Sequence, residues 1–290
     1  MNYVDKRNWK EVNAQLVRRG EFYLDLDCIQ NWPRELNEMN RKKSGAPYKY
    51  ANTFILFGSV IYSFLHMPYR QLEGFITRLG TYIPGLVAAD YTTLHKRISK
   101  LALQIPVPEE DVVVAIDSTG MKVTNRGEWM REKHGKVRRG WLKVHVAVDV
   151  KTKKLLSMEV TEEKVADSEV LRPLLKNINI EDGLMDGAYD TNDAFNLMKE
   201  KGVDCPGIKI RENAVVGVEP SPRSNAVLEY KKMWYKGWSQ MHQYGQRWAV
   251  EGFFSAVKRI FGETVRASSI DGMVSEITRL FIMYNIITSV

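Results

Sequence analysis

The pattern of hydrophobic and polar positions divides the chain near residue 106. Before that point the apolar residues follow helical spacing. From Val112 onward, β-branched runs mix with short helical segments, which is typical of a sheet flanked by helices. The connector Pro106-Val107-Pro108 between the two regions is stiff. We therefore expect a small helical region over residues 1–105 and an α/β domain over residues 106–290.

The first region is predicted to contain several helices. Residues 1–46 read as helices that are broken at Trp32-Pro33 and end in a basic, polar stretch. Asp90 is placed to cap a later helix. Three further helices are predicted, at residues 51–66, 69–79 and 91–103. Together these elements are compatible with a helix-turn-helix-like unit.

The helix predicted over residues 91–103 has the pattern of a DNA-reading helix. Leu94, Ile98 and Leu101 form a buried stripe, which leaves the basic residues on other faces. Those basic residues are Lys96, Arg97 and Lys100. One interpretation is that they contact DNA. The alternative is an exposed helix face that is merely solvated.

The second region is predicted to begin with three strands. The continuous β-branched run at residues 112–116 is typical of a buried central strand. Two more strands are expected, at residues 141–149 and 155–161. Helices at 168–176 and 192–201 then alternate with strands at 182–186 and 205–210. This order describes a ribonuclease-H-like α/β fold, a mixed sheet with flanking helices.

Residues 211–243 show no clear period and are interpreted as an insertion before the next helix. Trp234 and Trp238 lie within it, and Trp248 follows it. These indoles are either core anchors or faces on which an unpaired base could stack.

Charge and composition narrow the class of protein. The chain has 42 Lys and Arg against 35 Asp and Glu, so its net charge of +7 favours a polyanionic partner such as nucleic acid. Solubility alone is the other explanation. The two cysteines are isolated, which offers neither a disulfide framework nor a CxxC zinc motif. With no signal peptide and no apolar run long enough to span a bilayer, we expect a cytoplasmic, nucleoid-associated protein.

Two aspartates stand directly after predicted strands. Asp117 ends the first β-branched run, and Asp186 follows Gly183-Leu184-Met185. Ligands in open α/β sheets bind at the carboxyl ends of strands, so both carboxylates are expected at that edge. An isolated aspartate in such a place is usually a turn former or a cap, which is our interpretation of Asp182 and Asp190.

The helix predicted after residue 243 has two faces of different chemistry. Within about 60° of arc it carries four polar residues, Tyr244, Arg247, Glu251 and Lys258. The opposite face is suited to packing on a sheet and carries Val250, Phe253, Phe254, Val257, Ile260 and Phe261. The polar face would bring Glu251 to the strand-end aspartates. The alternative is an ordinary ion pair between Arg247 and Glu251, one turn apart.

These four polar residues match, at every spacing, the tyrosine-arginine-glutamate-lysine signature of the insertion-sequence-four transposase superfamily. Residues 116–119 and 185–190 resemble the first and second catalytic blocks of this superfamily. Residues 69–75 and 90–94 are similar to segments of the insertion-sequence-five family in particular. The resemblance extends from about residue 47 to 285. One departure is Ala166, which stands before Asp167 where a histidine is expected.

The resemblance implies a DDE transposase in which three carboxylates hold two Mg²⁺ ions, with Mn²⁺ as a substitute. The catalytic and metal-binding residues are then Asp117, Asp186 and Glu251. Carboxylate oxygens suit Mg²⁺, and two ions can activate the attacking oxygen and stabilise the leaving one.

Basic residues near this centre are expected to contact DNA. Arg247 and Lys258 would grip phosphates beside the scissile bond, and Tyr244 would add a hydroxyl or a stacking face. The predicted hairpin after Asp117 carries a further basic group that includes Arg138, Arg139 and Lys143. This hairpin either tracks the DNA backbone or is a plain solvated loop.

The sequence therefore predicts a transposase that cleaves the ends of an insertion sequence and joins them to target DNA. Residues 1–105 would bind the terminal inverted repeats, and residues 106–290 would form the catalytic domain. Because two DNA ends must be held together, a homodimer on double-stranded DNA is implied. The alternatives are a ribonuclease-H-like nuclease and a catalytically silent DNA-binding protein.

Overall fold

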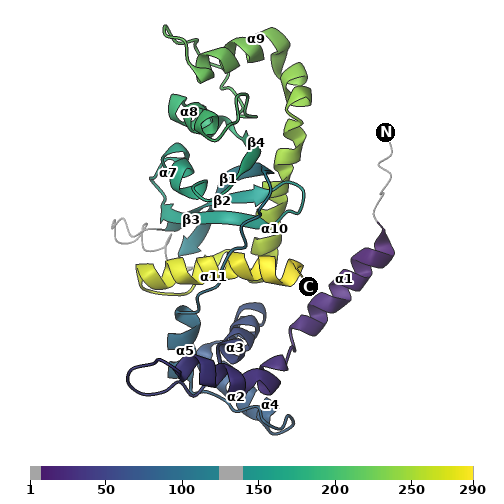
Figure 1. Cartoon of the computed structure of the whole chain (residues 1–290), viewed down its shortest axis with the longest axis vertical. Helices are drawn as coiled ribbons and strands as arrows, with labels where there is room; N and C mark the ends of the chain where they lie inside the picture. The colour runs from purple at the N-terminus through teal and green to yellow at the C-terminus, as the bar shows by residue number, and fades with distance from the viewer. Residues whose placement is uncertain (1–7, 124–139, 290) are drawn as a thin grey trace, which may run out of the picture. The chain divides into compact units, whose positions relative to one another are not determined.

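A computed structural model describes residues 8–123 and 140–289 and separates the chain into two units (Figure 1). One unit comprises Met1–Leu103 with Met283–Val290, and the other comprises Gln104–Ile282. The N-terminal region is helical, whereas the larger unit holds a mixed sheet with flanking helices. The predicted ribonuclease-H-like fold class is thereby confirmed.

Five helices form the N-terminal region of the described chain: α1 (Trp9–Phe22), α2 (Asp27–Asn40), α3 (Asn52–Phe64), α4 (Tyr69–Gly80) and α5 (Tyr91–Ser99). The apolar helix α3 is the centre, since most of its side chains are buried and it contacts α2, α4 and α5. Leu72, Leu94 and Ile98 complete this core at 1% exposure or less. Burial of such side chains stabilises a fold by about 1.5–3 kcal/mol each.

The predicted cap of α5 is confirmed. The backbone N–H groups of Thr92 and Thr93 donate to the Asp90 carboxylate, both at 3.0 Å. Hydrogen bonds from both threonines hold the pKa of Asp90 well below its usual range. The carboxylate thus satisfies donors that a helix start leaves without intrahelical partners.

The predicted break at Trp32-Pro33 is wrong, because α2 continues through Pro33. Proline inside a helix costs about 3 kcal/mol through a lost hydrogen bond and a clash. Packing offsets that cost: the Trp32 ring centroid lies 4.8 Å from Phe54 and 6.0 Å from Tyr50. Tertiary contacts therefore outweigh the local helix-breaking preference.

The larger unit is built on strands β1 (Val112–Val123), β2 (Trp141–Asp149), β3 (Leu155–Glu162) and β4 (Ile180–Met185). Their order in the sheet is β3-β2-β1-β4. The β1–β2 and β2–β3 pairs are antiparallel, and β4 is parallel to β1. A short strand, β5 (Thr264–Val265), also pairs in parallel with β1.

The strand predicted at 205–210 is reduced to a single parallel bridge between Met185 and Ile208. Pro206 has no N–H to give to a ladder, which limits pairing at this edge. The N–H of Gly207 instead donates to the side chain of Asp182 at 3.3 Å. Asp182 therefore holds the edge loop and does not cap a turn.

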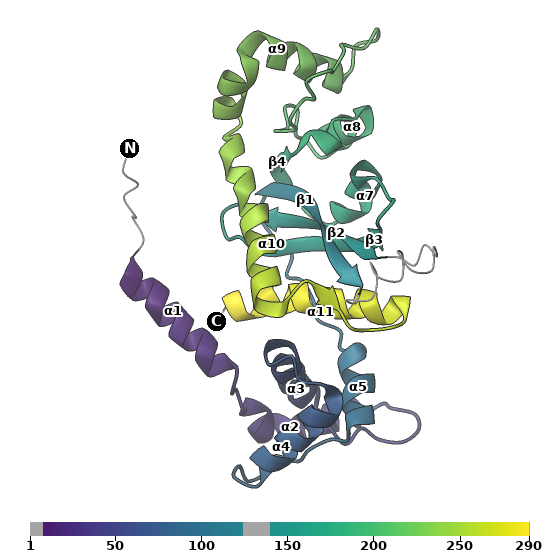
Figure 2. The ribbon, with the colours of Figure 1, turned by 180° about the vertical axis from the view of Figure 1, so that it is seen from behind.

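Helices α7 (Asp167–Leu174), α8 (Asn192–Glu200) and α10 (Trp248–Phe261) flank the sheet. Phe281 of α11 (Ile270–Thr288) packs against Phe253 of α10. Val114 and Ile116 of β1 share an apolar cluster with residues of α7 and α8. Successive strand residues point to opposite faces, so Ala115 and Asp117 face the other way. Helix α10 contacts β1 and β2 and lies in front of the sheet in Figure 2.

The segment predicted as an insertion without a period contains a helix, α9 (Pro222–Met241). Its start follows local rules, since Ser221 accepts from the N–H of Ser224 at 3.1 Å and Pro222 occupies the first turn. The backbone of Trp234 interrupts the helix with φ 59° and ψ 166°. This break shifts the apolar face, which explains why no single helical period spans the segment.

Candidate active site

Asp117 and Asp186 lie side by side because of the parallel pairing of β1 and β4. Ile116 pairs with Met185, so the next residue on each strand is one of the two aspartates. The predicted position of Asp117 at a strand end is wrong, since β1 continues to Val123. It is β4 that ends, at Met185. The termination of the neighbouring strand gives Asp117 access to solvent in mid-strand.

Asp186 begins a 3-10 turn, η1 (Gly187–Tyr189). Its carboxylate accepts from the N–H of Ala188 at 2.8 Å. This bond orients one oxygen of Asp186 at the end of β4 and leaves the other for a ligand.

The prediction that Tyr244, Arg247, Glu251 and Lys258 lie on one α-helix is wrong. Residues Tyr244–Arg247 form a 3-10 turn, η2, and α10 begins only at Trp248. A 3-10 turn advances by three residues and not 3.6, so the projected arc does not apply to Tyr244. Its ring is buried, and its hydroxyl donates to the carbonyl of Met185 at 3.1 Å. Tyr244 therefore connects η2 to the end of β4.

Arg247 joins two of the three carboxylates. Its Nη1 lies 2.8 Å from Oδ2 of Asp117, and its Nη2 donates to Glu251. The side chains of Arg247 and Asp117 are about one-fifth exposed, at 19% and 22%, whereas Glu251 is 56% exposed. The ion pair between Arg247 and Glu251, the structural alternative raised by the sequence, is present and extends to Asp117 on the sheet.

The electrostatics of the group indicate crowded negative charge. Burial raises the pKa of Asp117, and the nearby Asp186 raises it further, while bonds from Ser118 and Arg247 lower it. Burial alone would lower the pKa of Arg247, but Tyr244, Asp117 and Glu251 raise it overall. Burial raises the pKa of Tyr244 to about 12, so this hydroxyl stays protonated. The guanidinium thus offsets part of the repulsion among the acids.

The donor set fits a hard divalent cation. Asp117, Asp186 and Glu251 offer carboxylate oxygens, which are the ligands that Mg²⁺ and Mn²⁺ prefer. Asp117, Asp186 and Glu251 do not bring three ligand atoms within 4.8 Å of one another. Among the described residues, only another group brings three ligand atoms within 4.8 Å of one another. Arg247 contacts both Asp117 and Glu251.

Sequence reasoning missed a second polar group, on the opposite face of β1. Ser118 pairs with His145 on β2, and Asp167 at the start of α7 lies 2.8 Å from Lys143 Nζ and 3.2 Å from His145 Nδ1. Burial raises the pKa of Asp167, but interactions with His145, Lys143 and Ser118 outweigh it and lower the pKa well below its usual range. An acid at a helix start was the available signal.

Tyr189 was also missed. Its side chain is buried, and burial followed by Asp167, Asp117 and Asp186 raises its pKa. Its hydroxyl has no hydrogen-bond partner among the residues that the structure describes. The Tyr189 hydroxyl therefore stays protonated near the aspartates of both polar groups.

The other expected DNA-contacting residues fall into three situations. Lys258 is half-buried on α10, and Lys143 is held by Asp167 and by the carbonyl of Val165. Arg138 and Arg139 lie outside the described residues. Their DNA contacts stay predictions.

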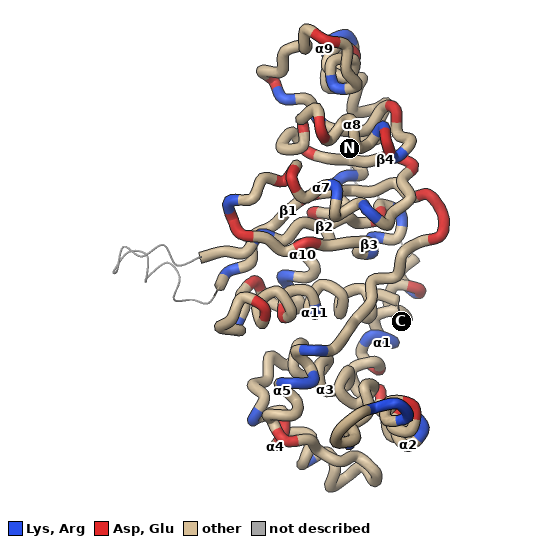
Figure 3. The backbone as a smooth tube through the Cα atoms, turned by 60° about the vertical axis from the view of Figure 1, so that its left-hand side comes forward, with Lys and Arg blue, Asp and Glu red and all other residues tan. Residues whose placement is uncertain are grey.

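Of the three basic residues of the α5 region, Arg97 has a structural position. Its guanidinium donates to the carbonyl of Tyr50 at 3.2 Å and to Asn52 Oδ1 at 2.8 Å, and burial lowers its pKa. Lys96 and Lys100 are exposed, and Figure 3 marks Lys and Arg positions in blue at α5. Of these three residues, Lys96 and Lys100 are therefore the ones placed to reach a partner outside the helical unit.

The mixed sheet, with acids on β1, at the end of β4 and on α10, defines the class of ribonuclease-H-like catalytic domains. The chain belongs to the transposase DDE domain family: one family model with that description matches residues 108–286, and a second with the same description matches residues 17–126. No solved structure matches the chain. In the described part of the chain, no helix combines the length and apolar character needed to cross a membrane.

Proposed function

We propose that this DNA transposase cleaves the ends of an insertion sequence and joins them to target DNA by two-metal phosphoryl transfer. The observation that carries the proposal is the assembly around Arg247. This residue contacts Asp117 on β1 and Glu251 on α10, and Asp186 lies beside Asp117. Asp117 and Asp186 lie where β4 ends, and Arg247 connects Glu251 on α10 to Asp117.

Asp117, Asp186 and Glu251 are the proposed ligands of two Mg²⁺ ions, for which Mn²⁺ would substitute. The ions would supply activation of the attacking water or 3′ hydroxyl and stabilisation of the leaving oxygen. Arg247 neutralises two of the acids in the free protein. A guanidinium can bind phosphate in a bidentate manner. We propose that Arg247 releases the carboxylates of Asp117 and Glu251 when DNA binds and contacts a phosphate beside the scissile bond.

Two further residues are proposed to serve this site in different ways. Lys258 would add a positive charge for phosphate on the face of α10 that carries Glu251. Tyr244 is proposed as a positioning residue, since its hydroxyl bonds the carbonyl of Met185, next to Asp186. With Arg247 and Glu251 these residues form the proposed insertion-sequence-four signature. The support for the proposed insertion-sequence-five assignment is the similarity of segments 69–75 and 90–94.

Two alternatives make different predictions. A simple nuclease would cut any duplex and join nothing, and a silent DNA-binding protein would not cut at all. The three carboxylates and the arginine between them favour an active site over a silent one. Strand transfer requires two ends to be held together, so we propose a homodimer on DNA, located with the nucleoid.

The purified chain should be incubated with Mg²⁺ and duplexes that carry the ends of the element encoding it, and with scrambled duplexes. We expect cleavage at the element boundary, joined products with a target plasmid, and loss of both when the metal is chelated. Equal cutting of scrambled duplexes without joining would support the nuclease. Binding without cutting would support the silent protein.

Sequence-specific end recognition is proposed to lie in the helical region over residues 1–105. Replacing Lys96 and Lys100 with alanine should weaken binding to an end-containing duplex and lower the slope of log affinity against log salt by about 1 per lysine. A binding titration at several salt concentrations measures this slope. Arg97→Ala is the matched control on the same helix, because its guanidinium bonds Tyr50 and Asn52.

The control variant Arg97→Ala should lower the melting temperature, whereas Lys96→Ala and Lys100→Ala should leave it unchanged. Unchanged affinity and salt slope in the double lysine variant would remove α5 from the DNA interface and would move recognition elsewhere in the chain.

A further inference from the structure

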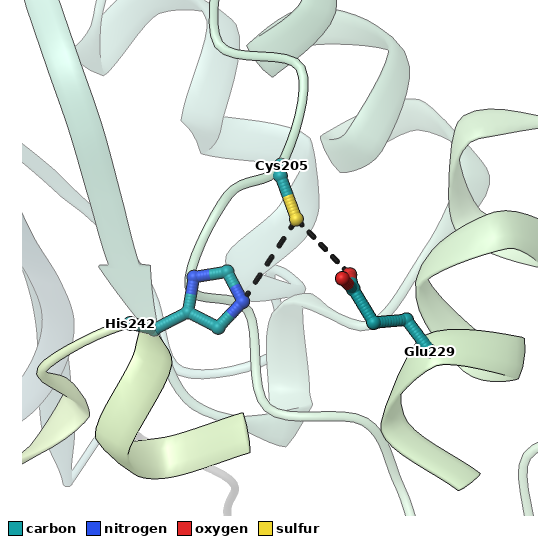
Figure 4. A group of neighbouring side chains, drawn as sticks. All are labelled: Cys205, Glu229 and His242. Atoms are coloured by element: carbon teal, nitrogen blue, oxygen red, sulfur yellow. Dashed lines mark hydrogen bonds between the residues drawn. The ribbon is translucent and has the colours of Figure 1, made fainter. Parts of the chain in front are cut away.

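Cys205, Glu229 and His242 converge outside the active site (Figure 4). One ligand atom from each lies within 4.8 Å of the other two. The Cys205 thiol donates to Glu229 Oε2 at 3.1 Å, and its Sγ lies 3.9 Å from His242 Nε2. In Figure 4 the imidazole and the carboxylate both point toward the sulfur. The group joins the loop after α8 to the middle and the end of α9.

The surroundings suit a cation. His242 is buried, Glu229 is half-buried and Cys205 is exposed, so the group is open on one side. Burial and then Glu229 raise the pKa of Cys205 to about 12, so the thiol of the free protein is protonated. Burial lowers the pKa of His242, although Asp182 and Glu229 oppose this, and the neutral ring keeps a lone pair for a ligand.

We propose that Cys205, Glu229 and His242 bind one Zn²⁺ ion. Sulfur, nitrogen and oxygen ligands together suit this borderline-soft cation, whereas Mg²⁺ prefers oxygen alone. Three protein ligands leave the fourth tetrahedral position to water at the open side. Binding displaces the thiol proton to solvent and forms the sulfur–zinc bond, so the affinity rises with pH. This site is chemically distinct from the carboxylates at Asp117.

The ion would restrain the segment of the chain that leads into the active site. His242 ends α9, and Gln243, with φ 47°, turns the backbone into η2. The ring of Trp238 lies 5.0 Å from His242 and 4.9 Å from Tyr244, whose hydroxyl bonds the carbonyl of Met185. Zinc at His242 would thus restrain η2, which carries Arg247 at its other end. Its role is positioning, without contact to the reacting atoms.

Cobalt is the direct probe, because a Co²⁺–thiolate bond gives a charge-transfer absorption that carboxylate ligands do not. We expect titration of the full chain with Co²⁺ to produce this band at one equivalent, and added Zn²⁺ to remove it. The chain has only two cysteines, so the matched control is Cys28, which is buried in the helical unit. Cys205→Ser should abolish the band, and Cys28→Ser should keep it.

Competition with a chromophoric chelator measures the affinity for Zn²⁺. Cys205→Ser and His242→Gln should each weaken it on the order of a hundredfold or more, since even outer partners of a metal site contribute 10–100-fold. Absence of the thiolate band in the folded wild-type chain would overturn the proposal, and so would its persistence in Cys205→Ser. Because these readouts involve no DNA, they are independent of the proposed transposition chemistry.

Discussion

Replacing Asp117 with asparagine is expected to reduce DNA cleavage by about a thousandfold or more, because losing a metal ligand forfeits several kcal/mol of transition-state stabilisation. Glu251→Gln should behave similarly. The measurement is the rate of cleavage of an end-containing duplex at saturating Mg²⁺. Asp193→Asn, which removes an exposed carboxylate on α8, is the matched control and should keep the wild-type rate.

The fold should survive this change. The pKa of Asp117 is raised in the folded state, so protonation favours folding and ionisation at neutral pH subtracts from stability. This penalty is absent below the pKa of the unfolded chain and is fully present once pH exceeds the raised folded value. Asparagine cannot ionise, so the melting temperature should be unchanged or higher at pH 7. Cleavage within tenfold of wild type in both variants would rule out this metal site.

Replacing Arg223 with methionine is expected to destabilise the larger unit by about 3–5 kcal/mol, because it leaves a buried carboxylate without its cation. The side chain of Asp190 is fully buried. Its carboxylate accepts hydrogen bonds from Arg223 Nε at 2.6 Å and from Arg223 Nη2 at 3.0 Å. The N–H of Arg211 donates to the same carboxylate at 3.1 Å. Urea unfolding of wild type and variant measures the difference.

Two control variants separate this buried pair from an ordinary surface pair. Arg172→Met breaks an exposed contact with Glu200 and should leave the urea midpoint unchanged. Adding Asp190→Asn to Arg223→Met removes the orphaned charge and should recover part of the loss. A midpoint for Arg223→Met that equals wild type would show that Asp190 is stabilised by other groups. The sequence had suggested only a turn former at Asp190.

Local rules determined much of the fold. The β-branched run after the Pro106-Val107-Pro108 connector predicts the central strand β1, and the cap at Asp90 predicts the start of α5. Both succeed because burial and capping act over a few neighbouring residues. The sequence period also separates the core face of α10, where Val250, Phe253 and Val257 are buried, from the face that carries Glu251.

What the sequence left open depends on pairing between distant segments. The register of β1 and β4 sets Asp117 beside Asp186, and the end of β4 exposes them. The 3-10 turn at η2 buries Tyr244, which a continuous helix would have placed with Arg247. Such features depend on where strands end and helices break. Competition between alternative packing arrangements decides those positions.

The group of Cys205, Glu229 and His242 shows most clearly what only the tertiary structure decides. The two cysteines are isolated in the sequence, and spacing alone predicted no zinc motif. Residue types and their helical or strand periods determined the fold class, the acids and the basic helix faces, because these depend on near neighbours. Only the tertiary structure brought Cys205 to His242 and Asp190 to Arg223, because packing α9 against α8 joins residues that no sequence period relates.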